Sequence, residues 1–115
     1  MGRGAPAASH GREQVAAAAQ RIAFALQLGE AFEAECQWLD ANDVYLTAAL
    51  TALQSGLISP EGLRRLARSV RWSEQVSVEQ SARLLHESLD QLSSELKDVA
   101  SHPLLQAASP SIHRV

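Results

Sequence analysis

Residues 78–99, VEQSARLLHESLDQLSSELKDV, carry apolar side chains that recur at steps of four and three. Such spacing is typical of a heptad stripe, here sustained for about three repeats. A stripe of this kind must be buried against another helix, either in the same chain or in a second copy. It therefore predicts a helical protein that associates. The stripe consists of Ala82 and six larger residues. We assign these six residues to self-association: Val78, Leu85, Leu89, Leu92, Leu96 and Val99.

A second long helix is expected from Glu13 to Asp40, where apolar residues again step by three and four. Its apolar surface is wide, because Phe24, Leu28, Ala31 and Trp38 form a second strip beside the first, and a helix of this kind usually touches two neighbours. Gly29 lies in the middle of this segment and indicates a close helix crossing or a bend. Cys36 falls on the apolar face, and we interpret it as a small buried side chain.

Two shorter helices are expected between these long ones. Asn42 and Asp43 can cap a helix over 44–54, which Gly56 would close in a left-handed conformation. Ser59 and Pro60 form a typical start for the next helix. Ser77, with Gln80 three residues later, resembles a capping box and predicts a separate last helix, which would end near His102 and Pro103. One kinked helix over 60–100 is the alternative.

These patterns predict an all-α fold, an antiparallel bundle of three to four helices in a single domain over residues 13–102. We expect flexible tails over 1–12 and 103–115, because the first of these is rich in glycine and neither shows a clear helical pattern. The long first helix should pack antiparallel to 78–99, with the two short helices closing one end. The heptad stripe and the alanine-rich faces favour a homodimer.

Composition limits the classes of function. The chain has 115 residues, a net charge of −3 and one cysteine, so an intramolecular disulfide is excluded and no general attraction to nucleic acid or to an anionic membrane is expected. No secretory signal or apolar span long enough for a membrane is recognisable, which predicts a cytoplasmic protein with no membrane partner. Nine arginines against one lysine, together with the alanine content, are typical of a GC-rich bacterial genome.

Motifs that would carry catalysis or bind a cofactor are not recognisable in the sequence. His86 and Asp90 are four residues apart on one helix face, the spacing of a metal-ligand pair, but such pairs are common on solvated faces. We therefore expect no enzymatic activity, no catalytic residue, no metal site and no cofactor.

The sharpest local signal is a group of four arginines within eight residues, followed by a tryptophan. Three of the arginines share one helix face, and Arg and Trp are enriched at the centres of protein interfaces. Leu63, Leu66, Ala67 and Val70 are expected to form the opposite, inner face. We assign partner binding to the following set: Arg64, Arg65, Arg68, Arg71 and Trp72.

Two alternatives remain for these arginines. They could pair with acidic side chains on neighbouring helices, or the segment around Gly56 could form a helix–turn–helix whose second helix binds nucleic acid. The favoured interpretation is a small non-enzymatic interaction module, an adaptor, chaperone or inhibitor, that binds another protein through its helical faces. A nucleic-acid-binding regulator that uses the Arg64–Arg71 helix is the second interpretation.

Overall fold

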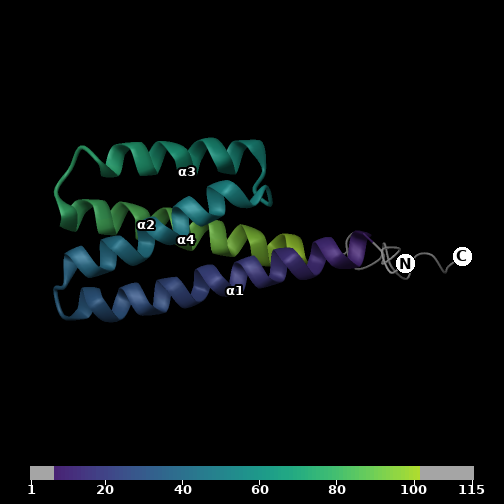
Figure 1. Cartoon of the computed structure of the whole chain (residues 1–115), viewed down its shortest axis with the longest axis horizontal. Helices are drawn as coiled ribbons and strands as arrows, with labels where there is room; N and C mark the ends of the chain where they lie inside the picture. Colours follow the sequence, from purple (N-terminus) through teal and green to yellow (C-terminus); the bar gives the residue numbers. More distant parts are fainter. Residues whose placement is uncertain (1–6, 102–115) are drawn as a thin grey trace, which may run out of the picture.

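A computed structural model of the chain describes residues 7–101, which form four α-helices and, within that range, no strand. The helices are α1 (Ala7–Ala34), α2 (Trp38–Ser55), α3 (Pro60–Ser73) and α4 (Val78–Ser101). Successive helices run in opposite directions along the long axis of the molecule (Figure 1). The predicted all-α antiparallel bundle is confirmed, with four helices. None of the helices between residues 7 and 101 combines the length and the apolar character needed to cross a membrane.

Three of the helices form the centre of the bundle. α1, α2 and α4 all pack on one another, whereas α3 packs on α4 and to a smaller extent on α2. The sequence suggested that the two short helices close one end of the bundle, but they do not. α2 lies along α1 and α4, and α3 lies on the side of the molecule away from α1 (Figure 1). The reason is length, because the 18 residues of α2 can follow most of the long helices.

Three helix ends lie where local sequence signals predicted them: the end of α2 and the starts of α3 and α4. Ser59 caps α3 by accepting a hydrogen bond from the Gly62 amide, with Pro60 in the first turn. Gly56 ends α2 in the left-handed conformation, with φ of 74°. The Ser77 hydroxyl accepts a hydrogen bond from the Gln80 amide at 3.2 Å. Residues 60–100 are therefore two helices and not one kinked helix, and α4 continues to the last described residue, Ser101.

The boundary between α1 and α2 differs from the prediction. α1 ends at Ala34 because the Gln37 amide bonds to the Phe32 carbonyl and the Cys36 amide bonds to the Glu33 carbonyl. These two bonds form a Schellman motif, which places Cys36 in the left-handed region, at φ of 58°. Cys36 is exposed and is not a buried core residue. The sequence signal was missed because this position usually holds glycine.

Two further sequence expectations change with that boundary. Trp38 belongs to the first turn of α2 and not to the first helix, and Asn42 and Asp43 lie inside α2 instead of capping it. At the other end, α1 begins at Ala7 and includes the second half of the expected N-terminal tail. Residues 1–6 and the expected tail over 103–115 lie outside the described residues.

The heptad stripe of α4 forms the core of this single chain. Ala82, Leu85 and Leu89 are completely buried, and Leu92 and Leu96 are nearly so. Val78 and Val99, at the two ends of the stripe, are exposed. Four of the six residues that we assigned to self-association are thus covered by α1, α2 and α3, so an interface between copies would have to use another surface.

Candidate functional site

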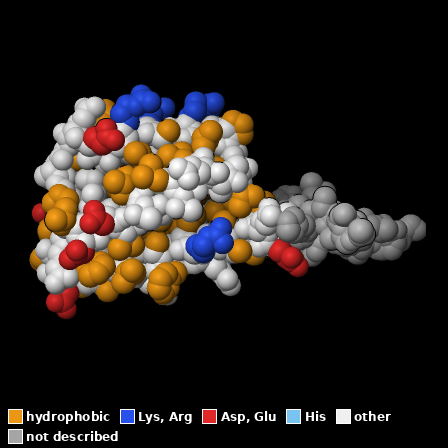
Figure 2. All heavy atoms as spheres, viewed as in Figure 1, with side chains coloured by type: hydrophobic (Ala, Val, Ile, Leu, Met, Phe, Trp, Pro, Cys, Tyr) orange, Lys and Arg blue, Asp and Glu red, His pale blue; other side chains and the backbone are white. Residues whose placement is uncertain are grey.

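The outer face of α3 carries the predicted arginine cluster. Arg64, Arg68 and Arg71 are exposed, and the side chain of Trp72 is 55% exposed. Figure 2 shows basic side chains along the edge of the molecule that α3 forms. Within residues 7–101, no carboxylate forms an ion pair with any of these three arginines. α3 contains four arginines and one glutamate, so this face is positively charged in a chain whose net charge is −3. We call Arg64, Arg68, Arg71 and Trp72 the basic face.

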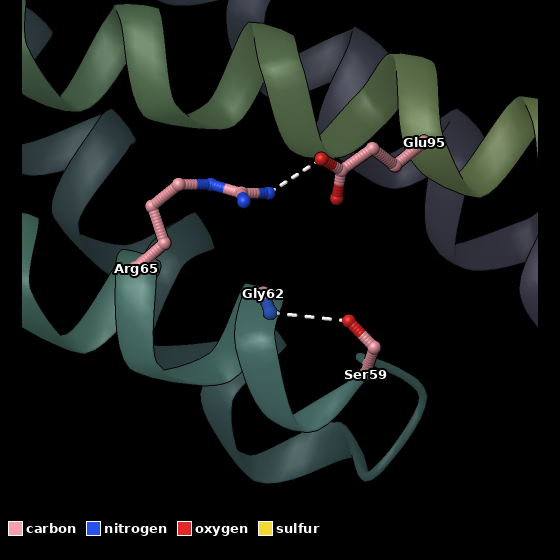
Figure 3. Close-up of polar contacts among 4 residues, drawn as sticks. All are labelled: Ser59, Gly62, Arg65 and Glu95. Carbon is pink, nitrogen blue, oxygen red and sulfur yellow. Dashed lines mark hydrogen bonds and ion pairs between the residues drawn. The ribbon is translucent and has the colours of Figure 1, made fainter.

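Arg65 does not belong to the basic face. Its guanidinium points toward α4 and forms an ion pair with Glu95, while Ser59 caps the start of the same helix (Figure 3). The interpretation in which the arginines pair within the bundle therefore holds for Arg65 alone among the four. Sequence could not separate Arg65 from its neighbour Arg64, because the separation depends on where α4 lies.

The inner face of α3 is made largely of small residues. Leu66 is the large apolar side chain that is buried there, with Gly62, Ser69 and Ser73 around it. Leu63, expected on this face, is 40% exposed. A Cβ atom on Gly62 would lie 2.7 Å from the Ile58 side chain, so glycine permits the close start of α3. Ser69 and Ser88 join α3 to α4 through a hydrogen bond between their hydroxyls.

The arrangement of α2 and α3 bears on the helix–turn–helix alternative. In that motif the two helices cross at a large angle, which leaves the second helix free to enter a groove. Here α2 and α3 run in opposite directions along the bundle (Figure 1). The basic face remains exposed, but its helix is part of an antiparallel bundle.

A second feature is an apolar groove of about 790 Å³ between α1 and α2. Small residues such as Ala17, Ala25 and Ala48 line it together with larger apolar ones, and among these Phe24 is 66% exposed. The sequence contained a signal for this groove in the second apolar strip of the first helix. α1 does touch two neighbours, α2 and α4, yet Phe24 and Leu28 remain exposed.

A third feature is a polar cluster where α1, α2 and α4 meet. The Tyr45 hydroxyl donates a hydrogen bond to Glu33, and Nε2 of His86 lies 2.7 Å from Oε2 of Glu30. The rings of Tyr45 and His86 meet edge to face with centroids 5.5 Å apart. His86 thus pairs with a residue of α1 and not with Asp90. Over the described residues, no group of three or more His, Cys, Asp or Glu side chains is placed to hold a metal ion.

Tyr45 is the centre of this junction. Its side chain is completely buried, and its ring occupies the space where a Cβ atom on Gly29 would lie, so the predicted close crossing at Gly29 is confirmed. Burial, the hydrogen bond to Glu33 and the negative charges of Glu33 and Glu30 raise the pKa of Tyr45 far above its ordinary value. The hydroxyl therefore stays neutral and acts as a donor that fixes α1 against α2.

Trp38 lies at the start of α2, where it contacts a cation. The guanidinium of Arg83 lies 5.0 Å from the centre of its ring, and Arg83 also pairs with Glu79 one turn earlier on α4. Trp38 is partly buried and packs against the core. Of the two tryptophans, Trp72 is therefore the one that remains open to a partner.

Comparisons of this chain with protein-family models, with curated proteins and with solved structures find no match.

Proposed function

We propose that this chain is a small non-enzymatic interaction module that binds an acidic protein segment through the basic face. The observation that carries the proposal is the set of three exposed arginines, unpaired within the described residues, beside the exposed ring of Trp72. An adaptor, a chaperone or an inhibitor would each use such a surface. The arginine and alanine content of the chain supports a bacterial source, and a cytoplasmic location is part of the same proposal.

The shape of the basic face favours a protein over a nucleic acid. From Arg64 to Arg71 the face extends over about 10 Å of helix, which is room for few phosphate contacts. Other surfaces are acidic, since the net charge of the chain is −3. Trp72 adds a large apolar ring, which together with arginine is typical of the centre of a protein interface.

The test is capture of partners from a lysate of the source organism by the immobilised full chain, quantified by mass spectrometry. Proteins bound by the wild type should be lost with the triple variant R64S/R68S/R71S. Their capture should be weaker with the single variant Arg68→Ser. It should be unchanged with Lys97→Ser, which removes one positive charge from an exposed position of α4. Circular dichroism checks that every variant folds.

Three results would overturn the proposal. The first is capture of the same proteins by the triple variant, and the second is a wild type that binds nothing beyond the bare matrix. The third is capture that disappears after nuclease treatment and falls steeply with salt, because release of counterions from phosphates has that signature. The third result would support the nucleic-acid-binding regulator instead.

A further inference from the structure

The groove between α1 and α2 lies on a side of the bundle that no other helix of residues 7–101 covers. α3 packs on α4 and α2 and makes no substantial contact with α1. Apolar side chains are visible on the face that α1 and α2 present in Figure 2. With 66% exposure, Phe24 is among the most exposed large apolar residues. Large exposed apolar residues around a groove mark an interaction surface.

Charge on the groove is limited to two residues of opposite sign. Among the residues that line it, Arg21 on α1 and Asp43 on α2 are charged, and neither has an ion-pair partner within residues 7–101. They are too far apart along the groove to pair with each other. Asp43 is the sixth residue of α2 and Gly29 is the sixth residue from the end of α1, so in two antiparallel helices joined by a short turn we expect them at similar levels. Arg21 is eight residues before Gly29, which corresponds to about 12 Å.

We propose that a second copy of this chain occupies the groove, related by a two-fold axis that crosses the helices. Such an axis reverses the direction of the groove, so Arg21 of each copy meets Asp43 of the partner. At each end of the interface, the arginine of one copy is then paired with the aspartate of the other. The midpoint between the levels of Arg21 and Asp43 falls at Phe24 and Ala25, so each Phe24 approaches the other copy near the axis.

The surface is self-complementary in shape as well as in charge. Each copy offers a bulky and highly exposed side chain, Phe24, beside small lining residues such as Ala25 and Ala48. A two-fold interface brings the same patch of both copies together, so the two Phe24 rings meet near the axis, each beside the small residues of the other copy. The dimer that the α4 stripe suggested is thereby moved to a different surface, and the proposal is independent of the basic face.

The experiment is sedimentation velocity of the full chain over a roughly hundredfold range of micromolar concentrations. The wild type should be a dimer that dissociates on dilution. Phe24→Asp should raise the dimer dissociation constant by more than about 100-fold, because it places a charge at the centre of the interface. Arg21→Asp and Asp43→Arg should each raise it about tenfold by placing like charges together.

The double variant R21D/D43R restores opposite charges across the two-fold axis and should regain most of the wild-type affinity. Leu50→Asp is the matched control, since Leu50 is an exposed leucine of α2 (42%) that does not line the groove. It should dissociate like the wild type. Circular dichroism again checks that each variant is helical.

A wild type that stays monomeric throughout would overturn the proposal and would leave the groove to a different protein. Dimers that persist in Phe24→Asp but dissociate in Leu50→Asp would overturn it as well. A double variant no tighter than the single ones would overturn the reversed orientation. The triple variant of the basic face should dimerise normally, so the two proposals can fail separately.

Discussion

Helices are held together in different ways at the junction of α1, α2 and α4 and at the contact between α3 and α4. At the junction, large completely buried side chains, Tyr45, Leu85 and Leu89, fill the space between three helices. Under α3, one buried leucine, Leu66, is surrounded by glycine and serine. Because buried apolar area supplies most of the stability of a small domain, the contrast indicates a stable three-helix core that carries a more weakly held fourth helix.

The same contrast suits the proposed division of surfaces. The basic face lies on α3, the helix with the smallest buried apolar contact, whereas the groove lies between two helices of the stable core. Regions that bind partners are often drawn from the less stable parts of a protein. A dimer interface, in contrast, gains from rigid helices because little order is lost when it forms.

The largest expected effect separates the two regions directly. Leu89→Ala should lower the free energy of unfolding by about 3–5 kcal/mol, because a completely buried leucine leaves a cavity among three helices. Leu66→Ala should cost about 2–3 kcal/mol at the edge of the bundle. Urea denaturation measures both. Hydrogen exchange of the Leu66 variant should show faster exchange in α3 than in α4. Equal exchange in both helices would contradict the contrast.

A second test addresses the tight crossing in the core. Gly29→Ala should lower the free energy of unfolding by about 1–3 kcal/mol, because the added methyl group meets the buried ring of Tyr45. Gly11→Ala is the matched control on the same helix, where nothing lies within 4 Å of the new Cβ atom. The control should be neutral or more stable by up to about 1 kcal/mol, the difference in helix propensity. If both variants behaved alike in thermal denaturation, the close contact with Tyr45 would be refuted.

The junction also predicts a dependence of stability on alkaline pH. The pKa of Tyr45 is raised in the folded state, whereas in the unfolded chain it is about 10. Its contribution is therefore fully present below about pH 10 and is lost as the pH rises above that value. Tyr45→Phe should cost about 1 kcal/mol at neutral pH, from the lost hydrogen bond. Melting temperatures of the wild type and of Tyr45→Phe, measured between neutral and strongly alkaline pH, test this dependence. The higher melting temperature of the wild type should disappear at the alkaline end.

The smallest expected effect concerns the turn that leads into α2. Cys36→Gly should raise the free energy of unfolding by about 1 kcal/mol, because glycine adopts the left-handed conformation without the steric cost of a side chain. Gly56→Ala, at the other left-handed turn, should lower it by a similar amount. A destabilised Cys36→Gly variant in urea would show that the cysteine side chain contributes a contact of its own.

Several elements were predictable from local sequence because their causes are local. Ser59, Pro60 and Gly56 set helix ends through bonds and backbone angles within one turn, and the α4 stripe showed which of its faces is buried. The end of α1 was not predictable, because Cys36 occupies a position that usually holds glycine. Arg64, Arg68 and Arg71 share one exposed face of α3, as their spacing predicted. The different placement of Arg65 was not predictable, since the carboxylate that binds it lies thirty residues away.

By itself, the sequence determined that the protein is helical, where two of its three described turns lie and which helix carries an excess of positive charge. These properties depend on the order of neighbouring residues. Only the tertiary structure decided that the α4 stripe is covered within one chain, that Tyr45 packs on Gly29, and that the groove between α1 and α2 stays open. Those outcomes depend on which helix faces meet, and many apolar faces in an alanine-rich chain are nearly equivalent until side chains of definite size are packed together.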